Sequence, residues 1–288
     1  MADSALRAET PGRAAWRRFV RHRAAVAGAC VFALAVAVAL LAPVLAPNPY
    51  ATSLLHARAA PGAAHWLGTD TLGRDVLARL VWGTRVSLAV GVAAVALYVA
   101  IGTVLGGIAG YLSGLADAVI MRLADVVLAF PTLLIVLAVV AISGQSLGDI
   151  ILAIGFTGWP PVARLVRASF LSLREQDFVR ASRLLGAGAP RIMWRHLLPL
   201  ASGPLMVAAT FGVASAVLME AGLSFLGVGV QPPTASWGNM LTQAQSLTVL
   251  QTMPWLWLPP CLCLALLVLG INFVGDGLRD ALDPRSDH

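Results

Sequence analysis

Two carboxylates and an arginine lie together in one short polar stretch and are the first candidates for chemistry. The residues are Asp70, Arg74 and Asp75, and paired carboxylates are typical of general acid–base catalysis. No histidine, serine nucleophile or set of metal ligands accompanies them. Because Gly68 and Gly73 indicate turns, we expect a local Arg–Asp network that folds a loop rather than a catalytic site.

Asp125 and Glu220 are the two acids that lie within or at the end of apolar runs. An acid at the centre of a bilayer costs about 2.5–3.5 kcal/mol on insertion scales, so each is a candidate functional residue. Two isolated acids do not form a proton relay. A structural ion pair or a helix cap explains them at least as well as proton coupling.

The cysteines and the absence of lysine argue against a metal site and a nucleotide site. Cys30, Cys261 and Cys263 lie inside apolar runs without metal-ligand spacing and are interpreted as small hydrophobic residues. The chain has no lysine, which the Walker A phosphate-binding motif requires. We therefore expect no catalytic residue, metal, cofactor or ATPase site in this chain.

The elements that hold these residues are predicted from hydropathy. The chain of 288 residues is 58% hydrophobic and 12% charged, whereas soluble domains are about 45–50% apolar and about 25% charged. A membrane helix needs about 20 apolar residues to cross about 30 Å of hydrocarbon. The sequence predicts an all-α integral membrane protein with about six transmembrane helices, at residues 24–46, 86–112, 123–142, 150–165, 200–223 and 256–274.

The first apolar run follows an arginine-rich segment and could therefore be a signal peptide. A signal peptide has an apolar region of about 7–15 residues, and the run at residues 24–46 is longer. We favour a retained membrane anchor. The fourth run is the weakest prediction, because Gly158, Pro160 and Pro161 interrupt it.

The distribution of arginine predicts the topology. With both termini on the inner side, 16 arginines fall in inner segments and four in outer ones, which agrees with the excess of positive charge expected in cytoplasmic loops. Neither arginine cluster is interleaved with aromatic residues, so we expect no nucleic-acid partner. The predicted segments are a cytoplasmic N-terminus (1–23), an anchor helix (24–46), an outer segment (47–85), a five-helix core (86–275) and a cytoplasmic tail (276–288).

The inner loop at residues 174–199 is too polar to span the membrane and too apolar to be a disordered linker. Asp177 can cap or begin a short helix that places Phe178, Ala181, Leu184 and Leu185 on one side. Gly186 and Gly188 would end this helix, and a second short helix with Ile192, Met193 and Leu197 would follow. The loop is either an interfacial helix on anionic lipid or a knob that docks in a groove of a cytoplasmic partner.

This loop resembles the EAA loop of ABC importer permeases, in which Glu-Ala-Ala is followed by three residues, a glycine and a stretch that ends in Leu-Pro. Arg180, Ala181 and Ser182 stand at the Glu-Ala-Ala positions, Gly186 is the glycine, and residues 198–199 close the pattern. Arg180 and Ser182 depart from the pattern, and the first departure removes a negative charge that could face the ATPase.

Further segments are similar to the dipeptide, oligopeptide and nickel branch of these permeases, and specifically to its second permease subunit. They occur in the same order from about residue 65 onward, which makes the resemblance more specific than the loop alone. The segments are residues 65–76, 82–88, 130–131, 163–167, 195–199, 220–229, 236–238 and 272–284.

The resemblance implies an importer in a bacterial cytoplasmic (inner) membrane. Its partners would be a second homologous permease, two cytoplasmic ATP-binding subunits and an extracytoplasmic substrate-binding protein. The permease would form half of the path for dipeptides or oligopeptides and would follow the ATPase subunits through its loop helix, with packed helices tilting as rigid bodies. The expected contacts with the ATPase are Phe178, Ala181, Leu184, Leu185, Gly186 and Ile192.

Three alternatives remain open at this point. The same family also carries nickel chelates, glutathione and some sugars, so the substrate stays undecided. An ion- or proton-driven transporter that works alone would explain the hydropathy, although the sequence has no clear inverted repeat. A membrane anchor or assembly factor without a pathway would also explain the hydropathy. Neither of these two classes accounts for the ordered series of motifs.

Overall fold

The structure is a computed structural model that describes residues 11–282. Long helices make up most of this part of the chain, and none of the described residues forms a β-strand. The helices in the first half are α1 (Pro11–Arg21), α2 (Arg23–Leu45), η1 (Leu54–His56), α3 (Val76–Leu112), α4 (Gly114–Leu128), α5 (Thr132–Ser143) and α6 (Leu147–Thr157). Those in the second half are α7 (Trp159–Leu173), α8 (Asp177–Leu184), α9 (Ala189–Ile192), η2 (Met193–Leu197), α10 (Leu198–Phe225), α11 (Trp237–Leu241), η3 (Thr242–Gln245), α12 (Leu247–Thr252) and α13 (Pro254–Leu282).

Within residues 11–282, five helical segments are long and apolar enough to cross a membrane, and the number is six if the bent pair α4–α5 counts as one span. This confirms the all-α membrane fold and the predicted number of spans. Helix α3 begins at Val76, well before the predicted membrane boundary near residue 86. The prediction that residues 47–85 form an outer segment therefore includes the first turns of α3.

The third predicted span is wrong as a single straight helix. Helix α4 ends at Leu128 and α5 begins at Thr132, and the two axes differ by 84°. Pro131 lies at the break. Proline has no backbone N–H and disfavours helical geometry in the residue before it, here Phe130, so a helix cannot continue through this point without strain.

The fourth predicted span tolerates its prolines because of where they fall. Gly158 keeps a near-helical conformation between α6 and α7, and Pro160 and Pro161 occupy the start of α7. The first turn of a helix makes no use of its N–H groups, so proline costs little there. Helices α6 and α7 together form one segment, Leu147–Leu173, that is long enough to span.

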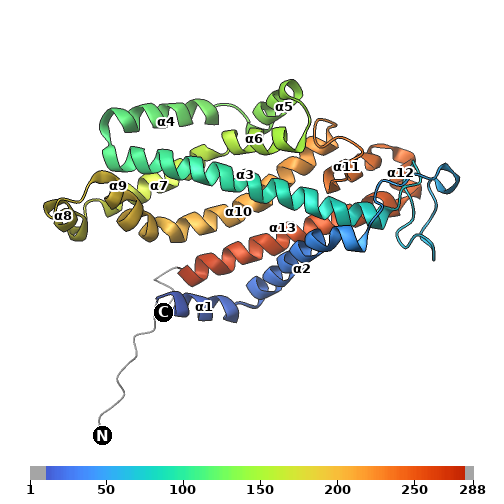
Figure 1. Cartoon of the computed structure of the whole chain (residues 1–288), viewed down its shortest axis with the longest axis horizontal. Helices are drawn as coiled ribbons and strands as arrows, with labels where there is room; N and C mark the ends of the chain where they lie inside the picture. Colours follow the sequence, from blue (N-terminus) through green and yellow to red (C-terminus); the bar gives the residue numbers. More distant parts are fainter. Residues whose placement is uncertain (1–10, 283–288) are drawn as a thin grey trace, which may run out of the picture.

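Helix α3 is the central element of the bundle and packs against α2, α6, α7 and α10 (Figure 1). Helices α8 and α9 lie at one end of the bundle, on the side where α1 and the end of α13 also lie. The loop before α3 and helices α11 and α12 lie at the opposite end. Each long segment therefore carries the chain from one end of the bundle to the other.

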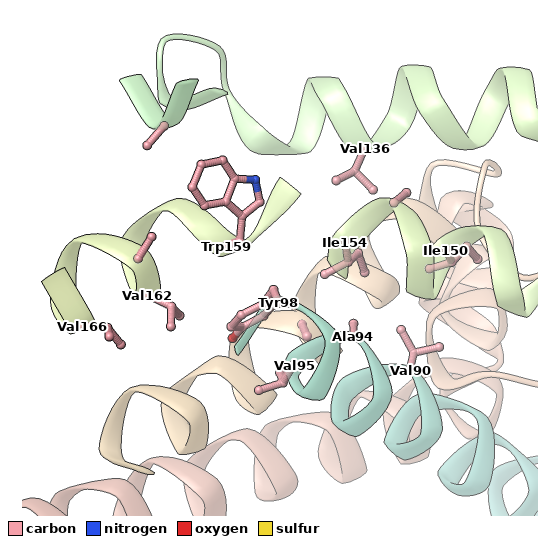
Figure 2. Packing of buried hydrophobic residues seen from close by; sticks show 14 of the residues in the cluster. Val90, Ala94, Val95, Tyr98, Val136, Ile150, Ile154, Trp159, Val162 and Val166 are labelled. Atoms are coloured by element: carbon pink, nitrogen blue, oxygen red, sulfur yellow. The ribbon is translucent and has the colours of Figure 1, made fainter. Parts of the chain in front are cut away.

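The main core lies between α3 and the helices on one side of it (Figure 2). Val90, Ala94, Val95 and Tyr98 of α3 face Val136 of α5, Ile150 and Ile154 of α6, and Trp159, Val162 and Val166 of α7. Many of these side chains are small, which allows membrane helices to approach closely and gain dispersion contacts that lipid would not supply.

Helix α2 packs along α13 on the other side of the bundle. A Cβ atom built on Gly28 would lie 2.2 Å from the carbonyl oxygen of Gly270, so the two backbones touch at this crossing. The opposite face of α2 leaves Leu40 and Val44 highly exposed. In a helix of this length and hydropathy, such an apolar face is suited to lipid.

Candidate functional site

The predicted inner loop folds as two short helices joined by a glycine turn. Helix α8 begins at Asp177, as predicted, with Gln176 at its N-cap. Gly186 has a φ of +82°, which is the left-handed region that favours glycine. Its N–H donates to the Arg183 carbonyl at 2.9 Å, and the Ala187 N–H donates to the Ser182 carbonyl at 3.0 Å. This pair of bonds is the Schellman pattern that ends a helix, and it confirms the predicted turn.

The loop presents a set of apolar side chains to the outside, which we call the exposed loop face. Leu184 and Leu185 are 89% and 88% exposed. Phe178, Ala181 and Gly186 are also exposed. Five of the six predicted contact residues therefore lie together on this face, at an end of the bundle (Figure 1).

Ile192 does not belong to the exposed loop face. Its side chain is fully buried in the main core together with Val179 and Met193. Val179 was not singled out from the sequence, because both sides of α8 carry apolar residues and the pattern does not say which side packs inward. The structure thus gives the loop two apolar sides, one anchored to the bundle and one open.

The residues that depart from the EAA pattern have local partners. The Arg180 guanidinium lies 3.9 Å from a Glu175 oxygen and 3.7 Å from an Asp177 oxygen. The Ser182 hydroxyl donates to the Phe178 carbonyl within α8 at 2.8 Å. The positive charge at position 180 is therefore partly balanced by neighbouring acids, and these surface pairs contribute at most about 1 kcal/mol.

Arginines on α7 connect the loop to α4. Arg167 binds Asp117 through two bonds, from Nε at 2.5 Å and from Nη2 at 2.6 Å, which is the strong bidentate geometry of arginine with a carboxylate. Arg164 Nη2 donates to Asp125 Oδ1 at 2.6 Å. Asp125 is thus in a structural ion pair, which is one of the two explanations considered for it.

The end of α7 is also tied to the turn between α3 and α4. Arg174 Nη1 donates to the Gly110 carbonyl at 3.2 Å and to the Ser113 hydroxyl. On the other side of the loop, η2 is a π-helical turn, in which the Leu198 N–H donates to the Met193 carbonyl. The loop is therefore continuous with α10 and is joined by hydrogen bonds to α3 and α4.

The loop before α3, which the sequence predicts to be an outer loop, contains the predicted Arg–Asp network. Arg74 Nε donates to Asp70 Oδ2 at 2.6 Å, and both residues are buried. Asp75 caps α3 by accepting the Ala78 N–H at 2.8 Å. The expectation that no histidine accompanies these residues is wrong, since His65 Nδ1 lies 2.8 Å from Asp75 Oδ2. The turns at Gly68 and Gly73 bring His65 back onto Asp75.

Glu220 is fully buried on α10. Its Oε1 accepts the Ser224 hydroxyl at 2.7 Å, and its Oε2 accepts the Ser87 hydroxyl of α3 at 3.1 Å. The Ser224 hydroxyl also accepts the Val230 N–H at 3.2 Å. Hydrogen bonds to serine, rather than the ion pair or helix cap considered from the sequence, hold Glu220 in the described part of the chain.

Two open cavities follow the contact between α7 and α10. One has a volume of about 460 Å³ and reaches Arg279 of α13, and the other has a volume of about 350 Å³. Both are lined by Ala208 and Phe211, so they adjoin each other at these residues, and we call the pair of cavities the groove. Tyr98, Thr132 and Ser215 are polar members of its wall. The hydropathy pattern did not indicate this groove.

Two family models match separate parts of the chain. The description "binding-protein-dependent transport system inner membrane component" matches residues 102–288, and "N-terminal TM domain of oligopeptide transport permease C" matches residues 10–61. A peptide permease protein of Brucella suis is 45% identical over 94% of this chain and 90% of its own length. The dipeptide transport system permease protein DppC of Alkalihalophilus pseudofirmus is 41% identical over 96% and 91%.

The fold is similar to that of a solved transporter chain. A structure of the MetNI methionine ABC transporter in an inward-facing conformation matches with a TM-score of 0.57, covering 71% of this chain and 96% of the other at 21% identity. The bundle, the ordered motifs and the identity over nearly full length agree with one another. The chain belongs to the family of binding-protein-dependent transport system inner membrane components and is a permease subunit of an ABC importer.

Proposed function

We propose that this subunit forms half of a path for dipeptides or oligopeptides across a bacterial inner membrane and is driven by ATPase subunits that dock on its exposed loop face. The names of the relatives support a peptide substrate, since they are called peptide and dipeptide permeases. The proposed assembly contains a second homologous permease, two cytoplasmic ATP-binding subunits and an extracytoplasmic binding protein.

The single observation that carries the docking proposal is the exposure of Leu184 and Leu185 at the tip of the loop. Two adjacent leucines beyond the ends of the long helices have no core to enter within residues 11–282. A short helix that lays its apolar side into a groove of another protein is a common mode of recognition. Val179 and Ile192 anchor the other side of the loop to the bundle, since both side chains are fully buried.

The connections of the loop suggest how its movement reaches the membrane helices. Arg167 and Arg164 tie α7 to α4 through Asp117 and Asp125, and η2 leads directly into α10. We propose that a displacement of the loop moves α4, α7 and α10 together as one packed unit. Packed helices move as rigid bodies because their interdigitated side chains resist continuous deformation.

The groove between α7 and α10 is our proposal for part of the pathway wall. Its polar members Tyr98, Thr132 and Ser215 could exchange hydrogen bonds with a peptide backbone, while Phe211 supplies an apolar surface. A path formed between two permeases would be open on one side in a single subunit. The groove meets this requirement.

The energy for transport has to come from the partner subunits in this proposal. The chain contains no lysine, so the lysine of a Walker A motif is missing. The arginine distribution supports a topology in which the exposed loop face, α1 and the end of α13 lie on the cytoplasmic side. The ATPase subunits would then meet the loop where ATP is available.

The test compares the same substitution on the two sides of α8. Leu185→Asp places a charge on an 88% exposed side chain, whereas Val179→Asp places it on a fully buried one. We expect Leu185→Asp to leave insertion and thermal stability unchanged but to reduce peptide uptake at least about tenfold, the effect of losing about 1.4 kcal/mol of docking free energy. Val179→Asp should reduce stability itself, because an unpaired charge is buried.

The readouts are uptake of a labelled dipeptide by proteoliposomes that contain the complete importer, and copurification of the ATPase subunits with the permease. Normal uptake and normal copurification with Leu185→Asp would contradict the docking role. Loss of copurification with retained membrane insertion would support it.

A further inference from the structure

A small polar cavity at the outer end of α3 takes no part in the proposals above. Its volume is about 20 Å³, slightly more than a single water-sized probe needs. It lies where the outer loop meets α3, α11, η3 and α13. The polar residues that line it are Asp70, Arg79, Asn239 and Gln243, and the apolar ones are Val76, Met240 and Leu256.

Arg79 is the least satisfied charged residue around this cavity. It is only 4% exposed, and its Nη1 atom has no hydrogen-bond partner among the described residues. Its other contacts are long, with Nη2 3.5 Å from Asn239 Oδ1 and Nε 3.6 Å from Asp70 Oδ2. A guanidinium keeps its charge and has five N–H donors, so a buried one with such weak contacts requires another acceptor.

Asp70 does not supply that acceptor. Its Oδ1 accepts the backbone N–H groups of Leu72 and Arg74, and its Oδ2 accepts Arg74 Nε at 2.6 Å. One carboxylate therefore faces two guanidinium groups, Arg74 and Arg79, which leaves one positive charge in excess in this cluster. The charge in excess lies on Arg79, because Arg74 holds the short contact.

Asn239 is also fully engaged. Its Nδ2 donates to the carbonyls of Val230 and Thr234, at 3.1 and 2.7 Å. Its Oδ1 accepts the Ser236 N–H at 3.2 Å in addition to the long contact with Arg79. The amide of Asn239 thus fixes the turn before α11 and has no free donor for a ligand in the cavity.

We propose that the cavity binds a small monovalent anion of the size of chloride, with Arg79 Nη1 as its charged donor and Gln243 as a second polar contact. A water molecule would accept the N–H group but would leave the positive charge unbalanced, and burial of an unpaired charge costs several kcal/mol. The small volume favours an anion of this size over a larger one. The bound anion would join the outer loop, α3 and η3 into one unit.

The experiment measures thermal unfolding of the purified full-length chain in nanodiscs of phosphatidylcholine. Sodium chloride is titrated against sodium gluconate at constant ionic strength, because gluconate is too large for the cavity. The expected result is a rise in Tm that saturates with chloride. Gln243→Leu should require about tenfold more chloride for the same effect, which corresponds to the loss of one hydrogen bond.

Two further variants complete the design. Arg79→Gln should remove the dependence on chloride, whereas Arg85→Gln should retain it, because Arg85 is an exposed arginine on the same helix. If Arg79→Gln does not fold, the test of the anion site is the chloride concentration at which Gln243→Leu reaches half of its rise in Tm. Equal Tm values in chloride and gluconate, or an unchanged midpoint in Gln243→Leu, would overturn the proposal. The readout is independent of transport and thus of the proposed function.

Discussion

Gly106 of α3 and Ala163 of α7 meet so closely that a Cβ atom at position 106 would lie 2.3 Å from the Ala163 carbonyl oxygen. Gly110, one turn further along α3, approaches Arg167 in the same way, with 2.8 Å to its carbonyl oxygen. Backbone thus packs on backbone along this contact. Because α7 leads into the exposed loop face, this contact determines where the loop is held relative to α3.

We therefore expect Gly106→Ala to destabilise the protein. The added methyl group would force α3 and α7 apart and cost about 1–3 kcal/mol, although alanine favours a helix by up to about 1 kcal/mol. Thermal unfolding in detergent measures the effect. Gly222→Ala on α10 is the matched control, since nothing lies within 4 Å of its Cβ position, and it should be neutral or slightly stabilising. Equal melting temperatures for the two variants would disprove the packing argument.

The second prediction concerns the backbone of Gly186. Nothing lies within 4 Å of a Cβ atom there, so the φ of +82° is the limiting factor. Gly186→Val should cost about 1–2 kcal/mol and weaken binding of the ATPase subunits about tenfold. Gly186→Asn should cost less, because asparagine tolerates this conformation. The measurement is titration of ATPase subunits onto the permease pair.

Gly188→Val is the control for this second prediction. Gly188 has a φ of −69°, which any residue adopts. The docking hypothesis requires that Gly186→Val weakens binding of the ATPase subunits more than Gly188→Val does. A larger loss of binding at position 188 than at position 186 would count against the glycine turn as the determinant of loop geometry.

The third prediction compares the two ion pairs between α4 and α7. Asp117 and Arg167 form two bonds and are mostly shielded, with 18% and 33% of their side chains exposed. Asp125 and Arg164 form one bond at 48% and 50% exposure. Double-mutant cycles with Asp→Asn and Arg→Gln should give a coupling of about 1–3 kcal/mol for the first pair.

The pair of Asp125 and Arg164 is the internal control and should couple by less than about 1 kcal/mol. Unfolding of the reconstituted subunit by denaturant provides the free energies. Equal coupling energies for the two pairs would show that solvent exposure does not decide the strength of the links between α4 and α7.

The fourth prediction concerns Ser224, whose hydroxyl donates to Glu220 and accepts the Val230 N–H. Ser224→Ala would leave both groups without this partner in a buried site, at a cost of about 1–3 kcal/mol. Ser215→Ala removes a hydroxyl from the same helix that is exposed and bonded to the Phe211 carbonyl. It should change the unfolding free energy by less than about 0.5 kcal/mol.

Thermal unfolding of both serine variants, in the same lipid, tests this difference. A Ser224→Ala protein as stable as the Ser215→Ala protein would mean that water replaces the lost hydroxyl.

The spans, the exposed loop and the glycine turn followed from local sequence. Runs of apolar residues predict membrane helices because each helix satisfies its own backbone hydrogen bonds. Gly186 predicts a helix end because the left-handed conformation costs glycine less than any other residue. Membrane helices and helix ends both depend on residues that are close together in the chain, so they can be predicted from a single sequence.

Other features depended on which residues meet across the bundle. The sequence analysis predicted one unbroken span over residues 123–142, whereas the structure breaks it at Pro131 and turns α5 by 84° from α4. The sequence did not pair His65 with Asp75 across a local loop, nor Arg167 with Asp117 on another helix, since only the folded chain brings these side chains together.

The sequence by itself determined that this protein is a bundle of membrane helices with an apolar loop at one end, which the arginine distribution predicts to be the inner end. Only the tertiary structure decided that Val179 and Ile192 face inward while Leu184 and Leu185 face outward. The physical reason is that hydrophobicity is a property of each residue, whereas burial is a property of its position against other helices. A short helix that is apolar on both sides does not reveal from its sequence which side the bundle will cover.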